Sequence, residues 1–200
     1  MLRGMVFVDH MNFDISLKKY YSSLEKSAPK LDYNKLFPNV VNLVPNVDYL
    51  KTFIFAPKPD DFLMKDPKLA SYYKWVCGLR NSKYIDVIEG RYISRPIGDT
   101  EKVIENHDTY YKVEKGTDVN LAIHALSKAY FNAYDVAFVM SGDTDYISVY
   151  KQLKNLGKIV VVVGLEGQNL RDIIPEVDNV CFLNEEFFDS CLRTQPVAIV

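Results

Sequence analysis

Four aspartates occupy positions where an apolar run ends or a helical pattern begins: Asp9, Asp118, Asp143 and Asp145. Carboxylates brought close together raise one another's pKa, and a bound divalent cation removes that cost. Oxygen-only ligands favour Mg²⁺ or Mn²⁺ over zinc. An ion held by two or three carboxylates, with open positions left, can bind a phosphate oxygen and lower the pKa of an attacking water. The chemistry that these residues predict is phosphodiester hydrolysis.

An aspartate at the end of a strand also has simpler explanations, as a turn residue or a helix cap. Asp118 alone is more readily explained as an N-cap, because its side chain would accept from the free amides of the following helix. Residues 141–145 (SGDTD) are more informative, since two carboxylates two residues apart after a buried strand have no role in packing. The coincidence of all these positions favours a shared site.

Short β-rich runs alternate along the chain with helical patterns, which is typical of a parallel α/β sheet. We predict strands at residues 5–8, 49–55, 84–88, 136–140, 159–163 and 180–183. We predict helices at residues 14–24, 32–43, 61–79, 118–130 and 146–156. The inner face of the fourth helix is expected to hold Val119, Ala122, Ile123, Leu126 and Ala129. The expected fold is a single Rossmann-like, three-layer α/β/α domain over residues 1–200, with a mainly parallel sheet.

Prolines and glycines set the limits of several elements. Pro57 and Pro59 are predicted to stop the second strand, and Pro38 is expected to disturb the second helix. Gly157 suits the position after the last turn of the fifth helix. Residues 90–114 are polar and irregular, and their two ends are expected to pair as a hairpin arm.

The strand order decides whether the aspartates meet. In open α/β sheets, sites form beyond the carboxyl ends of the strands, where the strand order reverses. With the order 3-2-1-4-5, that reversal lies between the first and fourth strands. Asp9 ends the first of these, Asp143 and Asp145 follow the other, and Asp118 begins the helix that leads into it. The four carboxylates should therefore converge on one edge of the sheet.

The composition limits the classes of function. A formal net charge of −2 and a pI of about 5.9 argue against a protein that coats nucleic acid, because that affinity comes from clustered Lys and Arg. Three widely spaced cysteines predict neither a disulfide framework nor a zinc site and fit a reducing cytosol. No apolar run is long enough to span a membrane. We therefore expect a soluble, cytoplasmic protein with no membrane partner.

Three segments of the chain, 7–12 (FVDHMN), 115–118 (KGTD) and 140–146 (MSGDTDY), the last followed by 157–161 (GKIVV), resemble the NYN domain family of PIN-like nucleases. Their order and spacing agree with that family over most of the chain. The resemblance implies a PIN-like fold, dependence on Mg²⁺ or Mn²⁺, and RNA as the substrate. It also implies that the four aspartates hold the metal and act in catalysis.

The resemblance assigns roles to four further residues. Asn12 would orient Asp9 or touch the scissile phosphate, and Lys115 would pair with a carboxylate or hold a phosphate. Ser141 would hydrogen-bond a ligand carboxylate, and Thr144 is placed with the substrate-binding residues. One departure is the pair of residues after Asp9, His and Met, which are bulkier than the small residues expected there.

Several other side chains are weaker candidates. His10 could relay protons, but a solvent-facing or satisfied turn histidine is the simpler interpretation. His107 and His124 are expected in a loop and on a helix surface, and Lys151, Lys154 and Lys158 on a solvated helix face. The candidates for RNA contact on the arm are Arg91, Arg95, Tyr110 and Tyr111.

Three functions remain in competition. The first is a metal-dependent ribonuclease. The second is a catalytically silent RNA-binding or assembly module on the same fold, which would gain nothing from clustered carboxylates that face a polyanion. The third is a phosphatase with an aspartyl nucleophile, which typically needs Asp-x-Asp at the end of the first strand, whereas residues 9–11 are DHM. The oligomeric state is left open, with a homodimer as one option.

Overall fold

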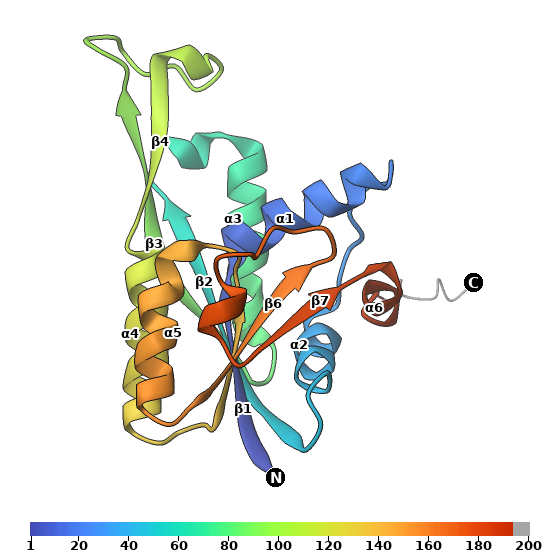
Figure 1. Cartoon of the computed structure of the whole chain (residues 1–200). Helices are drawn as coiled ribbons and strands as arrows, with labels where there is room; N and C mark the ends of the chain where they lie inside the picture. The colour runs from blue at the N-terminus through green and yellow to red at the C-terminus, as the bar shows by residue number, and fades with distance from the viewer. Residues whose placement is uncertain (194–200) are drawn as a thin grey trace.

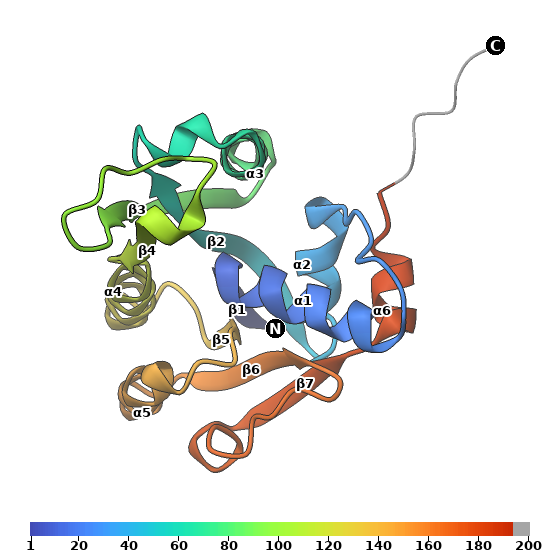
Figure 2. The same cartoon turned by 90° about the horizontal axis from the view of Figure 1, so that it is seen from above.

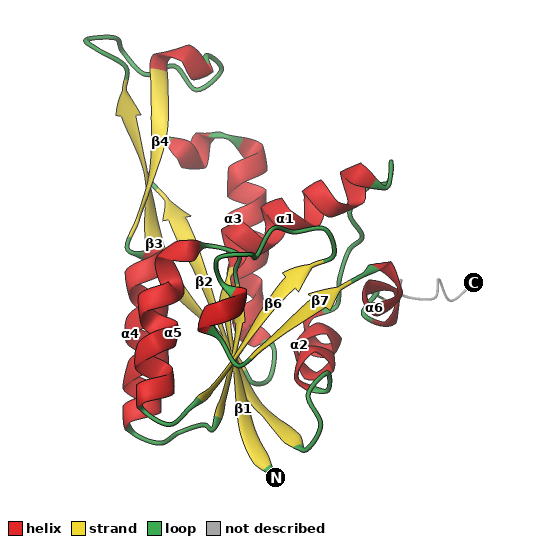
Figure 3. Ribbon diagram, in the orientation of Figure 1, coloured by secondary structure: helices red, strands yellow, loops and turns green. Residues whose placement is uncertain are grey.

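The computed structural model describes residues 1–193 and contains one seven-stranded sheet. Six strands are parallel and the edge strand β4 is antiparallel to β3, in the order β4-β3-β2-β1-β5-β6-β7 (Figures 1 and 3). The strands are β1 (Leu2–Asp9), β2 (Val47–Pro59), β3 (Ile85–Pro96), β4 (Tyr110–Lys115), β5 (Val136–Met140), β6 (Ile159–Leu165) and β7 (Asn179–Leu183).

Helices cover both faces of the sheet and make the three layers visible from above in Figure 2. The α-helices are α1 (His10–Ser23), α2 (Tyr33–Val41), α3 (Pro67–Gly78), α4 (Thr117–Tyr130), α5 (Ile147–Asn155) and α6 (Glu185–Ser190). One apolar core lies between the sheet and α1, α2, α3 and α6, and a second lies between the sheet and α4 and α5. Alternate residues of the central strand β1 enter opposite cores, so Val6 and Phe7 are both fully buried.

The predicted fold class and strand order are confirmed. The strands predicted as 3-2-1-4-5 are β3-β2-β1-β5-β6 of the sheet, and β4 and β7 extend it at its two edges. The reversal of order therefore lies between β1 and β5, where Val8 is the Cα partner of Met140. Both strands carry their following loops to the same edge.

The predicted stop at Pro57 is wrong, because β2 continues through it, whereas the strand does end at Pro59 as predicted. Thr52 donates its backbone amide to Tyr84, just before β3, and Asp60 donates to Tyr92 of β3. The amide positions of the odd-numbered residues between Thr52 and Asp60 therefore face the opposite side. The neighbour on that side, β1, has already ended at Asp9, which is paired with Phe55. The missing proline amides therefore remove no bond from the sheet.

The β3 and β4 strands form an antiparallel pair that projects beyond the rest of the sheet (Figure 1). Arg91 is the Cα partner of Lys115, and Arg95 is the partner of Tyr111. The polar sequence of this segment hid the length of β3, which was predicted to end at residue 88 and continues to Pro96.

Two helix starts differ from the prediction. α1 begins at His10 rather than residue 14, because the carboxylate of Asp9 caps it. α4 begins at Thr117 after Gly116, which has φ = +82° and makes no side-chain cap. Asp118 is therefore in the first turn of α4 and is not the predicted N-cap.

The inner face of α4 was also predicted partly wrongly. Val119 and Ile123 are 59% and 58% exposed, while Leu121 and Ala125 are buried. Ala122 and Leu126 are half-buried and pack against the core as predicted. Ala129 is buried as predicted.

Other elements follow local rules. Asp32 caps α2 as predicted, and Pro38 lies inside that helix without ending it. The predicted helix over 61–79 is a short 3-10 turn followed by α3, which Asp66 caps. Gly157 has φ = +73°, as its place after α5 requires. No helix within residues 1–193 is long and apolar enough to cross a bilayer.

Candidate active site

The site begins with Asp9, the last residue of β1 and the N-cap of α1. Its Oδ1 accepts a bond of 3.1 Å from the backbone amide of Asn12. Its Oδ2 lies 3.3 Å from the Ser141 hydroxyl and 3.3 Å from the Tyr146 hydroxyl. The side chain is only 6% exposed, so these bonds hold a carboxylate almost out of solvent.

Tyr146 connects two of the predicted acidic residues. Its hydroxyl lies 2.7 Å from Asp118 Oδ1, closer than it lies to Asp9. The phenol has one proton to donate, so one carboxylate at a time receives it. Burial and the negative charges of Asp9 and Asp118 raise the pKa of Tyr146, so the hydroxyl stays protonated. The carboxylates of Asp9 and Asp118 therefore meet at a single oxygen.

The loop after β5 is fixed from both ends. Asn12 Oδ1 accepts from the backbone amide of Gly142 at 3.0 Å, and the Ser141 hydroxyl accepts from the amide of Asp143 at 3.2 Å. Asp143 Oδ1 in turn accepts from the amide of Asp145 at 2.9 Å. These bonds tie the β5 loop to the first turn of α1.

The predicted aspartates differ in their surroundings. Asp143 lies near Asp9, because the negative charges of both residues raise the pKa of the buried Tyr146 and Tyr150 hydroxyls. Asp145 is exposed, as is its neighbour Thr144, and neither side chain bonds to Asp9 or Asp118. Two of the four carboxylates thus lie together, a third lies near them, and the fourth lies at the rim.

Burial first, and then the nearby negative charges of Glu114 and Asp118, raise the pKa of Asp9 to about 6, against hydrogen bonds from Asn12 and Ser141 that lower it. Burial and the charge of Asp118 also raise the pKa of Glu114. The site therefore holds excess negative charge. Among residues 1–193, no Lys, Arg or His forms an ion pair with Asp9, Asp118, Asp143 or Glu114.

Glu114 is a member of the cluster that sequence reasoning missed. It lies on β4 as the Cα partner of Tyr92, one residue before the predicted Lys115. Its position depends on the pairing of β4 with β3, and nothing in the sequence fixes which face of that arm is turned toward the site. Lys115 and its partner Arg91 are both exposed beside it and supply a local basic rim.

The side chains of the site are of the type that binds a hard divalent cation, but they are not yet arranged around one point. The available groups are oxygen donors with uncompensated negative charge, which suit Mg²⁺ or Mn²⁺. Within the described part of the chain, no three His, Cys, Asp or Glu side chains already stand in a geometry that could hold a metal ion. The Tyr146 hydroxyl lies between the two nearest carboxylates.

A family model agrees with this arrangement of elements and residues: the NYN domain model matches residues 3–184. The chain belongs to the NYN domain family. Members of this family are typically PIN-like nucleases, which generally use divalent metals. The family match thus confirms the resemblance seen in the sequence.

A solved structure supports the fold of this NYN domain. The crystal structure of a protein of unknown function from Vibrio parahaemolyticus RIMD 2210633 is similar, with a TM-score of 0.58 and 19% sequence identity. The similarity covers 93% of this chain and 95% of that chain. No curated protein matches the chain.

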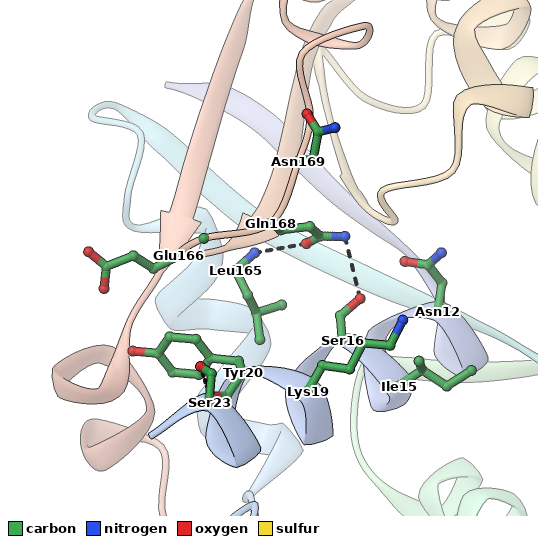
Figure 4. A pocket seen from close by; sticks show the side chains of 11 residues that line it. Asn12, Ile15, Ser16, Lys19, Tyr20, Ser23, Leu165, Glu166, Gln168 and Asn169 are labelled. Atoms are coloured by element: carbon green, nitrogen blue, oxygen red, sulfur yellow. Dashed lines mark hydrogen bonds between the residues drawn. The ribbon is translucent and has the colours of Figure 1, made fainter. Parts of the chain in front are cut away.

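A polar pocket of about 460 Å³ lies on one flank of α1 in the NYN domain (Figure 4). Asn12, Ser16 and Lys19 line it from the helix, and Gln168 reaches across from the loop after β6. The Gln168 amide lies 3.4 Å from the Ser16 hydroxyl, and its carbonyl oxygen accepts from the Leu165 amide at 3.0 Å. A Cβ at Gly142 would collide with the end of the Gln168 side chain, which would then have to move.

The weaker candidates divide clearly. His10 is fully buried and is not solvent-facing; its ring nitrogens lie 2.5 Å from the Tyr72 hydroxyl and 2.9 Å from the Tyr33 hydroxyl. Tyr110, a predicted RNA contact, is buried against Phe62 and does not present its ring to solvent.

The remaining weaker candidates are one tyrosine of the arm and three lysines. Tyr111 is 50% exposed beside Arg95. Lys158 is buried with its ammonium 2.7 Å from Asn132 Oδ1, contrary to the predicted solvated face. Lys151 and Lys154 lie near Glu176 and Asp178 as ordinary surface ion pairs.

Proposed function

We propose that this NYN domain is a metal-dependent ribonuclease that hydrolyses RNA phosphodiester bonds. The observation that carries the proposal is the meeting of Asp9 and Asp118 at the Tyr146 hydroxyl, with no Lys, Arg or His of residues 1–193 paired to either carboxylate. Such a pair does not stabilise the fold, because a desolvated carboxylate beside other negative charges is destabilising.

Each residue has a role in this proposal. Asp9 and Asp118 would be the principal ligands of Mg²⁺ or Mn²⁺, with Asp143, Asp145 and the newly found Glu114 completing the cluster from the loop and the arm. The ion would supply Lewis-acid charge to a phosphate oxygen and to the attacking water. Asn12 and Ser141 would fix the orientation of Asp9. Lys115, with Thr144 on the opposite loop, would contact the substrate.

The alternative is a catalytically silent RNA-binding module on the same fold. Such a protein would need cationic groups where the backbone of RNA lies, since phosphate contacts provide most of the affinity. The deepest charged group of the site is instead a carboxylate, Asp9. The exposed Arg91 and Lys115 fit the rim of an enzyme equally well.

The test is incubation of the purified protein with labelled single- and double-stranded RNA and DNA, in Mn²⁺, Mg²⁺ or EDTA. We expect RNA cleavage that needs the metal, stops in EDTA, and leaves a 5′-phosphate and a 3′-hydroxyl. A 2′,3′-cyclic phosphate product would mean that the RNA's own 2′-hydroxyl attacks, which contradicts the mechanism.

A matched variant separates the protein's own activity from a contaminant. Asp143→Asn keeps the size of the side chain but removes one negative charge, and we expect the rate to fall by at least about 10²-fold. RNA affinity in EDTA should hold or rise slightly, since a charge that repels phosphate is gone. Equal cleavage by both proteins would exclude this cluster as the catalytic site.

A further inference from the structure

A second pocket lies on the opposite flank of α1 from the polar pocket, in the notch that β1 leaves when it ends. It encloses about 290 Å³, at the lower end of the roughly 300–1,000 Å³ typical of small-molecule sites. Its walls come from α1, the end of β2, α3 and β3. The apolar and aromatic side chains that line it are Met11, Ile15, Pro57, Pro59, Leu69, Tyr72 and Tyr92.

The chemistry of these walls follows from the strand pairing. The amide positions of Pro57 and Pro59 face the side that β1 no longer occupies, so proline rings stand where other residues would present N–H groups. Tyr92 is the Cα partner of Pro59 and adds an aromatic ring beside it. The pocket thus offers flat apolar surface at the edge of the sheet.

One wall of the pocket is held rigid. The Tyr72 hydroxyl lies 2.5 Å from His10 Nδ1 and 3.8 Å from Met11 Sδ, so the ring is fixed by the residues that directly follow Asp9. His10 is itself locked by Tyr33 at its other nitrogen. An aromatic ring that is already ordered loses little entropy when a flat ligand stacks on it.

The pocket adjoins the acidic site. Met11, which lines the pocket, is two residues after Asp9, and Tyr92, which lines it from β3, is the Cα partner of Glu114. Asp14 of α1 also lines it, paired with Lys18. Lys68 is exposed at the rim. A polymer whose phosphate lies at Asp9 would therefore carry its neighbouring group toward this notch.

We infer that this pocket receives one unpaired nucleobase of a single-stranded RNA, adjacent to the phosphate that is cut. The inference rests on the proposed nuclease function for its substrate. The pocket has room for a flat base against its aromatic wall, and bases stack on aromatic rings with little regard to sequence. A duplex presents no such free base face, because its bases are already paired and stacked. Stacking also supplies affinity where the carboxylates repel the backbone. The protein should consequently prefer single-stranded RNA to duplex.

Binding in EDTA tests the pocket separately from catalysis. A fluorescently labelled 12-nucleotide RNA is titrated by anisotropy with the wild type, Leu69→Trp and Ser71→Trp. Leu69→Trp fills the pocket from α3, while Ser71→Trp adds the same side chain at an exposed position of α3 outside the lining. We expect Leu69→Trp to raise the Kd roughly 10-fold, in the range for one lost stacked base, and Ser71→Trp to leave it unchanged.

A second pair of variants guards against an effect of misfolding. Tyr92→Leu should weaken binding in the same direction, while Tyr92→Phe keeps the ring and should bind as the wild type does. The same RNA annealed to its complement should bind more weakly and should not distinguish the variants. A single-stranded DNA of the same sequence tells whether the base alone is sufficient or the ribose contributes.

The results separate this inference from the proposed function. If Leu69→Trp binds single-stranded RNA as tightly as Ser71→Trp, the base pocket is wrong, whether or not the protein cleaves RNA in Mn²⁺. Tight binding of duplex, weakened equally by both tryptophans, would also overturn it. If RNA binds with the expected sensitivity but no metal yields cleavage, the pocket stands and the nuclease proposal fails.

Discussion

Asp9 and His10 follow one another in the chain and are both buried, yet they lie in opposite surroundings. Asp9 meets other carboxylates through Tyr146, and burial with those charges raises its pKa to about 6. His10 lies among Tyr33, Tyr72 and Trp75, and burial lowers its pKa to about 4. The end of β1 thus places a carboxylate in the acidic site and, one residue later, a neutral histidine in the apolar core. Asp9 is therefore expected to act in the chemistry of the site, and His10 in the stability of the fold.

The largest effect is expected at Asp9. Asp9→Asn keeps the N-cap of α1, because asparagine caps as well as aspartate, but removes the buried negative charge. The RNA cleavage rate should fall by at least about 10²-fold, since metal-ion catalysis provides several kcal/mol. Asp32→Asn is the matched control, as Asp32 caps α2 in the same way. A comparable loss in both variants would show that capping, and not metal binding, is at stake.

His10 should affect stability more than chemistry. His10→Ala leaves a cavity and two tyrosine hydroxyls without their partner, which should lower the free energy of unfolding by about 2–4 kcal/mol. Urea denaturation followed by fluorescence measures this change. The cleavage rate per folded molecule should stay within a few-fold of the wild type. A loss of rate like that of Asp9→Asn, in fully folded protein, would make His10 part of the chemistry.

Asp9 and His10 should change the free energy of unfolding in opposite directions as the pH rises. Folded Asp9 keeps its proton up to about pH 6, so its contribution is present at low pH and is lost as pH rises from about 4 to 6. Folded His10 stays neutral down to about pH 4, so its contribution is present above pH 6.5 and is lost as pH falls toward 4.

Urea midpoints in EDTA between pH 4 and 6.5 test these signs. Asp9→Asn should make stability rise more steeply with pH than in the wild type, and His10→Gln should make it rise less or fall. Each group changes the slope by at most about 1.4 kcal/mol per pH unit. Slopes that change in the same direction in both variants would contradict the assignment of opposite surroundings.

The smallest effect is expected at the contact between the carboxylates. Tyr146→Phe removes the hydroxyl that bonds to Asp118 and reaches Asp9, with little change in volume. Stability in EDTA should fall by about 1 kcal/mol, and Mn²⁺ should restore more of it than in the wild type because the ion now faces bare carboxylates. Thermal unfolding with and without Mn²⁺ measures both. No loss in EDTA would mean that the hydroxyl contributes nothing to holding the pair.

The strand pattern was sufficient to predict the sheet order and the edge at which Asp9 lies. Periodicity could not give the start of α4, because Gly116, in a left-handed conformation after β4, takes the N-cap position predicted for Asp118. Glu114 and Tyr146 were missed because their roles depend on which face of β4, and of the 3-10 turn after β5, is turned toward Asp9. Gln168 was missed for a similar reason, since it comes from a loop whose path no pattern predicts.

The central claim is that the carboxylates of Asp9 and Asp118 bind a divalent cation at the junction of β1 and β5. Calorimetric titration of Mn²⁺ into the EDTA-treated and dialysed protein at pH 7 measures this directly, with Asp9→Asn, Asp118→Asn and the capping control Asp32→Asn alongside. We predict saturable binding by the wild type and Asp32→Asn, and binding at least about 10-fold weaker in each of the other two variants, as expected for the loss of one charged ligand. Equal Mn²⁺ affinity in all four proteins would contradict the account.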